Sequence, residues 1–79
     1  MDLATLRQLV IDSLPKFGVS APEPNWEMAL VAGSCHLGWR FEFDRLRVYW
    51  LRANNAIQFY NQDWILLGEL KLHQSMMAA

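Results

Sequence analysis

Two glutamates, Glu27 and Glu42, come closest in this sequence to the arrangement needed for acid–base chemistry. Each lies in a segment where large apolar residues alternate with other residues, as in a half-buried strand. A register that places Leu30 opposite Trp39 also places Glu27 opposite Glu42, and two opposed carboxylates can share one proton. However, Arg47 falls beside Glu42 in the same row, and such a site would be flat and hydrated. We therefore interpret these residues as a solvated charge ladder, and we predict no catalytic residue and no enzymatic activity.

The pair Cys35-His36 is a second candidate, because thiolate and imidazole groups are metal ligands. A metal site needs three or four ligands, and the only other histidine, His73, lies near the far end of the chain. We therefore expect an ordinary loop between two strands, with no metal. The single cysteine excludes an intrachain disulfide, and the sequence has no glycine-rich phosphate loop, so no cofactor is predicted.

Three further residues, Arg40, Tyr49 and Tyr60, could bind single-stranded nucleic acid or a small ligand by stacking. The competing interpretation is a protein contact in which Arg40 lies on the tyrosine rings. The chain has 7 basic and 8 acidic residues and a net charge of -1, so it lacks the positive field that attracts a phosphate backbone. We therefore favour the protein contact and keep nucleic acid or a small ligand as the alternative.

An amphipathic helix is predicted over residues 2–14. Its apolar stripe recurs at helical spacing, at Leu3, Leu6, Val10 and Leu14. Asp2 is a suitable N-cap, and Pro15 should end the helix because it lacks an N–H and disfavours helical geometry in the residue before it. Residues 15–25 contain all three prolines of the chain, which predicts a proline-rich loop.

From Trp26 onward the apolar residues recur with a period of two, which is typical of β-strands. The alternating segments predict five strands, at 26–32, 37–43, 46–52, 56–61 and 64–72. The short loops between them favour an antiparallel meander in the order 1-2-3-4-5, with the helix packed on one face. The predicted fold is therefore α+β. It is a single domain over residues 1–79, in which the sheet occupies 26–72 and residues 73–79 form a frayed tail.

The predicted register follows from two-residue turns at 44–45, 54–55 and 62–63 and a four-residue loop at 33–36. It places large apolar residues opposite one another on the helix side of the sheet. The expected partners are Leu30 with Trp39, Trp39 with Trp50, Trp50 with Phe59, and Phe59 with Leu66. The predicted core is Leu6, Val10, Trp39, Phe41, Val48, Trp50, Phe59 and Leu66.

The opposite side of the predicted sheet also carries large apolar residues, and one helix cannot cover both sides. An exposed apolar patch of this kind usually marks a contact surface. We therefore expect a small non-enzymatic interaction module, most simply a homodimer or a module with a protein partner. The predicted interface comprises Arg40, Tyr49, Leu51, Tyr60, Ile65 and Leu67. The free edge of the fifth predicted strand is a second candidate contact.

The composition places the chain among folded proteins outside the membrane. Hydrophobic residues make up 53% of it and charged residues 19%, which is too apolar for a disordered chain. The uncharged run over residues 28–39 is too short to span a bilayer. We expect a cytoplasmic protein, because it has one cysteine and because Asp2, Arg7 and Asp12 interrupt the apolar pattern that a signal peptide would need.

Overall fold

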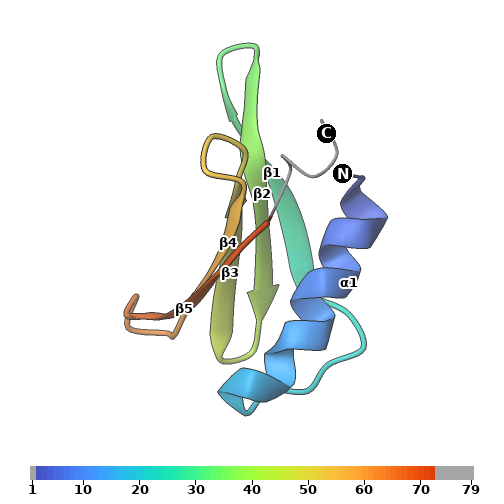
Figure 1. Cartoon of the computed structure of the whole chain (residues 1–79), viewed down its shortest axis with the longest axis vertical. Helices are drawn as coiled ribbons and strands as arrows, with labels where there is room; N and C mark the ends of the chain where they lie inside the picture. The colour runs from blue at the N-terminus through green and yellow to red at the C-terminus, as the bar shows by residue number, and fades with distance from the viewer. Residues whose placement is uncertain (1, 73–79) are drawn as a thin grey trace.

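A computed structural model describes residues 2–72 as one helix packed against one face of a five-stranded antiparallel sheet (Figure 1). The strand order is β1-β2-β3-β4-β5, so the predicted α+β meander is confirmed. The elements are α1 (Leu3–Ser13), η1 (Leu14–Phe17), β1 (Trp26–Ala32), β2 (Cys35–Phe43), β3 (Leu46–Leu51), β4 (Ala56–Tyr60) and β5 (Leu66–Lys71). The predicted frayed tail, residues 73–79, lies outside the described residues.

Helix α1 begins as predicted, since the Asp2 carboxylate accepts a hydrogen bond from the Thr5 N–H at 2.8 Å. The α-helix ends at Ser13, but Pro15 does not open a loop as predicted. It occupies the first turn of the 3₁₀ helix η1, where its missing N–H has no consequence. The helical segment then stops at Gly18, whose φ of 74° lies in the left-handed region that glycine adopts without strain.

The core lies between α1 and the face of the sheet that it covers, which we call the helix face. Of the predicted core, six residues are buried, namely Leu6, Val10, Phe41, Val48, Trp50 and Phe59. Leu14, Phe43, Leu46 and Ile57 are also buried there. Phe17 of η1 stacks on Phe59 with ring centroids 4.6 Å apart. This ring lies over Gly68 of β5, where a Cβ atom would come within 3.0 Å of it.

The hairpin between β2 and β3 has the predicted register. Phe43 pairs with Leu46, Phe41 with Val48, and Trp39 with Trp50. The next hairpin differs by two residues, because residues 52–55 form a four-residue loop in place of the predicted two-residue turn. Trp50 therefore pairs with Ile57, and the prediction that it pairs with Phe59 is wrong. A shift of two leaves every side chain on its predicted face.

The register of β1 differs by one residue, and this turns the strand over. The connection is a two-residue turn at Gly33 and Ser34, so β2 begins at Cys35 inside the predicted loop. Leu30 pairs with Gly38 and Val31 with His36, which leaves Leu37 as an extra residue in β2. Residues 26, 28 and 30 therefore lie on the face away from the helix, and the predicted pairing of Leu30 with Trp39 is wrong.

Two predicted core residues are corrected by these registers. Trp39 is only partly buried, because its cross-strand neighbour is the small Ala29 in place of Leu30. Leu66 is 50% exposed, because β5 starts there after a longer loop and carries an irregularity at Leu67. Leu66 consequently pairs with Tyr60, and Gly68 takes the place opposite Phe59 that Leu66 was predicted to hold.

Candidate functional site

The face of the sheet away from α1, which we call the outer face, is a candidate contact surface. The registers place its side chains in three rows that cross the five strands from β1 to β5. The first row is Trp26, Glu42, Arg47, Tyr60 and Leu66. The second is Met28, Arg40, Tyr49, Gln58 and Glu69. The third is Leu30, Gly38, Leu51, Ala56 and Lys71.

Glu42 lies in the first row of this face, on β2, between two arginines. Its Oε2 accepts a hydrogen bond from Arg40 Nε at 3.2 Å, and its Oε1 lies 3.8 Å from Arg47 Nε. All three side chains are largely shielded from solvent. The carboxylate therefore neutralises charge between two guanidinium groups, and its position does not resemble that of a catalytic acid.

Both guanidinium groups also lie over aromatic rings, in the geometry of cation–π contacts. The Arg40 Cζ is 5.0 Å from the Trp26 ring centroid, 5.4 Å from that of Tyr49 and 5.6 Å from that of Trp64. The Arg47 Cζ is 4.2 Å from the Trp64 centroid. The Glu42 carboxylate and the aromatic rings thus restrain both arginine side chains in the unbound protein.

Trp64 reaches the outer face because the loop between β4 and β5 is folded by Asn61. The Asn61 Oδ1 accepts hydrogen bonds from the N–H groups of Asp63 at 2.8 Å and Ile65 at 3.0 Å, and its backbone C=O accepts one from Trp64 at 3.1 Å. Trp64 has a φ of 64°, an uncommon conformation for a bulky residue. The loop projects away from the helix, on the side of the outer face (Figure 1). The ring centroid of Trp64 lies 6.0 Å from that of Tyr49 and 6.1 Å from that of Tyr60.

A shallow hollow of about 280 Å³ opens beside Trp64. It is lined by Tyr49, Leu51, Gln58, Tyr60 and Trp64. The Tyr60 hydroxyl donates a hydrogen bond to Gln58 Oε1 at 2.9 Å, and Gln58 Nε2 donates to Glu69, so these two polar side chains of the lining are already paired. The remaining lining is mostly aromatic and aliphatic, which suits an apolar side chain or a planar ring.

The predicted interface residues are only partly brought together. Arg40, Tyr49, Leu51 and Tyr60 share the outer face, whereas Ile65 lies in the loop before β5 and Leu67 is the irregular residue of β5. Their role in an interface stays a prediction. The predicted pairing of Leu30 with Trp39 implied that Trp26 and Met28 face the helix, and the predicted fifth strand included Trp64; the structure contradicts both. The available signal for Trp64 was Asn61, because an asparagine side chain readily hydrogen-bonds the backbone N–H two residues on, next to the predicted turn at 62–63.

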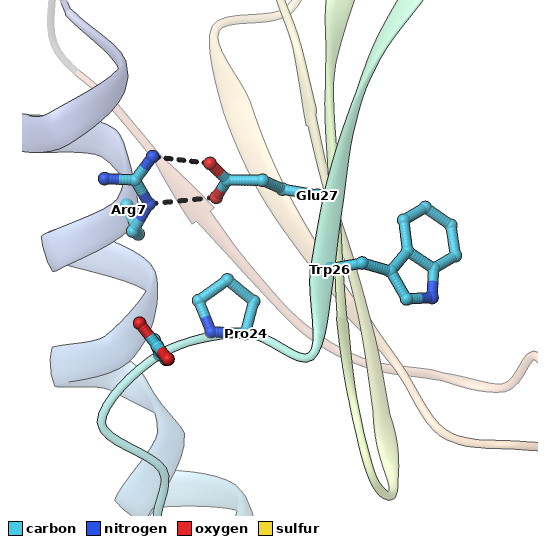
Figure 2. A pocket seen from close by; sticks show the side chains of 5 residues that line it. Arg7, Pro24, Trp26 and Glu27 are labelled. Atoms are coloured by element: carbon cyan, nitrogen blue, oxygen red, sulfur yellow. Dashed lines mark hydrogen bonds and ion pairs between the residues drawn. The ribbon is translucent and has the colours of Figure 1, made fainter.

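Glu27 and Glu42 do not face each other, so the predicted pair of opposed carboxylates is wrong. Because β1 is turned over, Glu27 points toward α1 while its neighbour Trp26 points to the opposite side of the strand (Figure 2). Arg7 of α1 donates hydrogen bonds to both carboxylate oxygens of Glu27, one of them at 2.9 Å from Nε. These bonds lower the pKa of Glu27 below its ordinary value of 4.5 and raise that of Arg7. The open space beside this ion pair, about 330 Å³, is bounded by Glu23 and Pro24.

Cys35 and His36 begin β2, which corrects the predicted loop. Arg52 Nη2 lies 3.1 Å from His36 Nδ1, and since arginine only donates, this nitrogen acts as the acceptor. The imidazole packs edge-on against Trp39 with centroids 5.2 Å apart. His36 is therefore committed to packing and to one hydrogen bond.

Within residues 2–72, no three side chains from His, Cys, Asp and Glu lie close enough together to hold a metal ion. In the same span, neither helical segment has the length and apolar character needed to cross a lipid bilayer. No protein-family model, curated protein or solved structure matches this chain significantly.

Proposed function

We propose that this protein is a non-enzymatic interaction module that binds a second copy of itself through the outer face. The observation that carries the proposal is the exposure of four large side chains on that face. Trp26 and Met28 are each 44% exposed, Trp64 is 49% exposed and Leu66 is 50% exposed. A half-exposed indole offers about 100 Å² of surface, so the patch reaches several hundred Å², a large part of the ~800 Å² that one partner buries in a standard interface.

The types of residue and their rigidity also favour a protein contact. Tryptophan, tyrosine and arginine are the residues enriched among those that contribute most to binding energy at interfaces. Arg40 and Arg47 are already held by Glu42 and by the aromatic rings. Binding therefore immobilises few additional side chains, and this lowers the entropy cost of association.

A second copy suits this face better than a strongly charged partner. Its charges nearly balance, because Glu42 offsets part of the charge of Arg40 and Arg47, and Glu69 and Lys71 carry opposite charges on β5. Two such faces can meet about a two-fold axis without a strong field that opposes the approach. A chain of 79 residues also has a small core, so burying this patch against another copy would add to its stability.

The proposal predicts that charging the outer face halves the mass of the protein in solution. The face variant combines Met28→Glu with Trp64→Asn, because asparagine accepts the left-handed backbone at residue 64. At low-micromolar concentration we expect a dimer for the unmodified chain and a folded monomer for the face variant. The measurement is analytical ultracentrifugation, with circular dichroism to check the fold.

The matched control combines Val31→Glu with Leu37→Asn. These residues are also exposed and apolar, but they lie near the end of the β1–β2 hairpin and outside the central patch. The control should keep the mass of the unmodified chain. A face variant that keeps that mass as well, or an unmodified chain that is monomeric, would contradict the proposal.

The hollow beside Trp64 favours a second candidate function, the binding of a small planar ligand or of single-stranded nucleic acid. Tyr49, Tyr60 and Trp64 could stack on a base there, with Arg40 and Arg47 close by. If this candidate is correct, an oligothymidine will quench tryptophan fluorescence, less strongly at high salt, and Trp64→Asn will abolish the effect. Fluorescence that does not change with the oligonucleotide would leave the contact between copies as the proposal.

A further inference from the structure

Strand β5 presents a free edge with a regular backbone over residues 68–72. Among residues 2–72 it pairs only with β4, since it is the last strand of the sheet. An unpaired edge that carries leucines is a surface that proteins usually cover or protect. The irregularity at Leu67 disturbs the beginning of the strand, and Lys71 is the only lysine on it.

The other edge of the sheet, β1, is better protected. It carries Glu27, whose charge is drawn to the helix face by Arg7, and it has a break in pairing between Leu30 and Val31. Inward-pointing charges and bulges are the devices by which edge strands avoid pairing with other chains. The two edges are therefore unequal, and β5 is the one available for pairing.

The outward backbone groups of β5 belong to Glu69 and Lys71. The Leu72 N–H donates to the Asn55 C=O at 2.9 Å, so residue 72 directs its backbone groups toward the rest of the sheet. Because these groups alternate in direction along a strand, those of Leu70 also point inward, and those of residues 69 and 71 point to the open edge. The side chains of Glu69 and Lys71 both lie on the outer face.

These two residues make the edge complementary to itself. In an antiparallel pair centred on Leu70, Glu69 of each copy lies directly opposite Lys71 of the other. The two positions are also the ones with outward backbone groups, so each facing pair would exchange two hydrogen bonds. Opposite charges directly across a pair of strands are stabilising. Pairing centred on residue 69 or 71 would instead place like charges opposite each other.

We propose that β5 pairs with β5 of a second copy in this antiparallel register, which joins two sheets into one continuous sheet. The two-fold axis is perpendicular to the sheet, so both helices lie on one side and both outer faces on the other. Leu70 of each copy meets its counterpart on the helix side, where this side chain already packs at the margin of the core. This contact is separate from the one proposed for the outer face, because it uses only the β5 ends of two rows and leaves Trp26, Met28 and Trp64 open.

The edge contact is the weaker of the two, since it involves few residues and about four backbone hydrogen bonds. We expect it at protein concentrations of several hundred micromolar, where the outer-face contact is already formed. The unmodified chain should then form assemblies larger than a dimer. The face variant, Met28→Glu with Trp64→Asn, should form only the edge-paired dimer.

A charge-exchange experiment in the face variant tests the edge contact independently of the outer face. Adding Lys71→Glu places glutamates opposite glutamates, and adding Glu69→Lys places lysines opposite lysines. Each change should weaken dimerisation about tenfold when sedimentation equilibrium is measured at high concentration. An equimolar mixture of the two variants should restore the original affinity, because each glutamate then faces a lysine.

Hydrogen exchange provides a second measurement on the same samples. The amides of Glu69 and Lys71 should exchange more slowly at high than at low concentration, while the neighbouring amide of Leu70 should not change. A face variant that stays monomeric at high concentration would overturn the proposal. Variants that dimerise equally well, or a mixture that fails to restore the affinity, would overturn it too. None of these outcomes bears on the outer-face contact.

Discussion

The two faces of this sheet use similar residues with different outcomes. On the helix face, Trp50 is 8% exposed and belongs to a core that also contains side chains of α1, β2 and β4. On the outer face, Trp64 is 49% exposed and lies on two arginines. One short helix supplies enough apolar surface to cover one side of a five-stranded sheet. Apolar composition alone therefore does not distinguish a core from a contact surface.

The two faces also differ in where their charged side chains lie. Among residues 2–72, the ion pair on the helix face is that of Arg7 with Glu27, between α1 and the edge strand β1. On the outer face, Arg40, Glu42 and Arg47 lie on the inner strands β2 and β3, among aromatic rings. Charges are costly to bury, so a core admits them at its margin, whereas a surface can carry them in the middle. Charge placement therefore identifies the outer face as the one that the helix leaves open.

The largest expected difference between the faces is in the stability of matched tryptophan variants. Trp50→Ala should lower the free energy of unfolding by about 3–5 kcal/mol, because it leaves a cavity in the core. It also removes the hydrogen bond from Trp50 Nε1 to Asn55 Oδ1 at 3.1 Å, and Asn55 in turn binds the Leu72 C=O. Urea denaturation followed by circular dichroism measures the change, and a loss of this size would unfold much of a domain this small.

The matched change on the outer face is Trp64→Ala. It removes contacts with Arg40 and Arg47 that are worth about 1 kcal/mol at a partly exposed site, so unfolding at low concentration should change by no more than that. Equal losses for the two variants would show that the outer face is part of the core of the single chain. The distinction between the faces would then fail.

A smaller effect is expected from the ion pair at the margin of the helix face. The folded protein lowers the pKa of Glu27 below 4.5, chiefly through the hydrogen bonds from Arg7. A lowered carboxyl pKa contributes stability that is present above the unfolded value and is lost as the pH falls through the folded value. The melting temperature of the unmodified chain should therefore exceed that of Glu27→Gln at pH 7, and the two should converge below pH 4.5.

The control for this measurement is Asp63→Asn. Asp63 is exposed, and its carboxylate forms no ion pair with any other of residues 2–72. Removing its charge should therefore leave the difference in melting temperature between pH 7 and pH 3 nearly the same as in the unmodified chain. If Glu27→Gln behaves like this control at every pH, the ion pair contributes nothing to the docking of α1 on β1.

Much of the fold could be read from local patterns. The N-cap at Asp2, the stripe of Leu6 and Val10 and the turn at residues 44–45 each depend on neighbours within a few positions. The same holds for the central strands, where Phe41 and Val48 alternate with polar residues and leave one choice of inner face. Order and number of strands followed, because short loops permit only antiparallel neighbours.

The candidate site could be read only in part, because its ends depend on loop geometry. Arg40, Tyr49 and Tyr60 were placed on the correct face, since they lie on strands with unambiguous alternation. Trp64 was not, because its position follows from the five-residue loop that Asn61 organises and from a left-handed backbone that no periodicity predicts.

The sequence by itself determined the elements, their order and the inner face of β2, β3 and β4, because these depend on short-range alternation and turn propensity. Tertiary structure alone decided which side of β1 faces the helix. Both sides of that strand are apolar apart from Glu27, so the alternation of residues does not indicate which side is buried. The orientation of β1 is set by the turn at Gly33 and by the extra residue Leu37. It is also set by Arg7, 20 positions away in the chain, which binds Glu27.

Gly38 allows β2 and β3 to lie close together at this irregularity. The Cβ atom of any other residue at position 38 would lie 1.9 Å from the Trp50 carbonyl oxygen. A one-residue shift moves every side chain of a strand to the other face, and only contacts distant in sequence can select it.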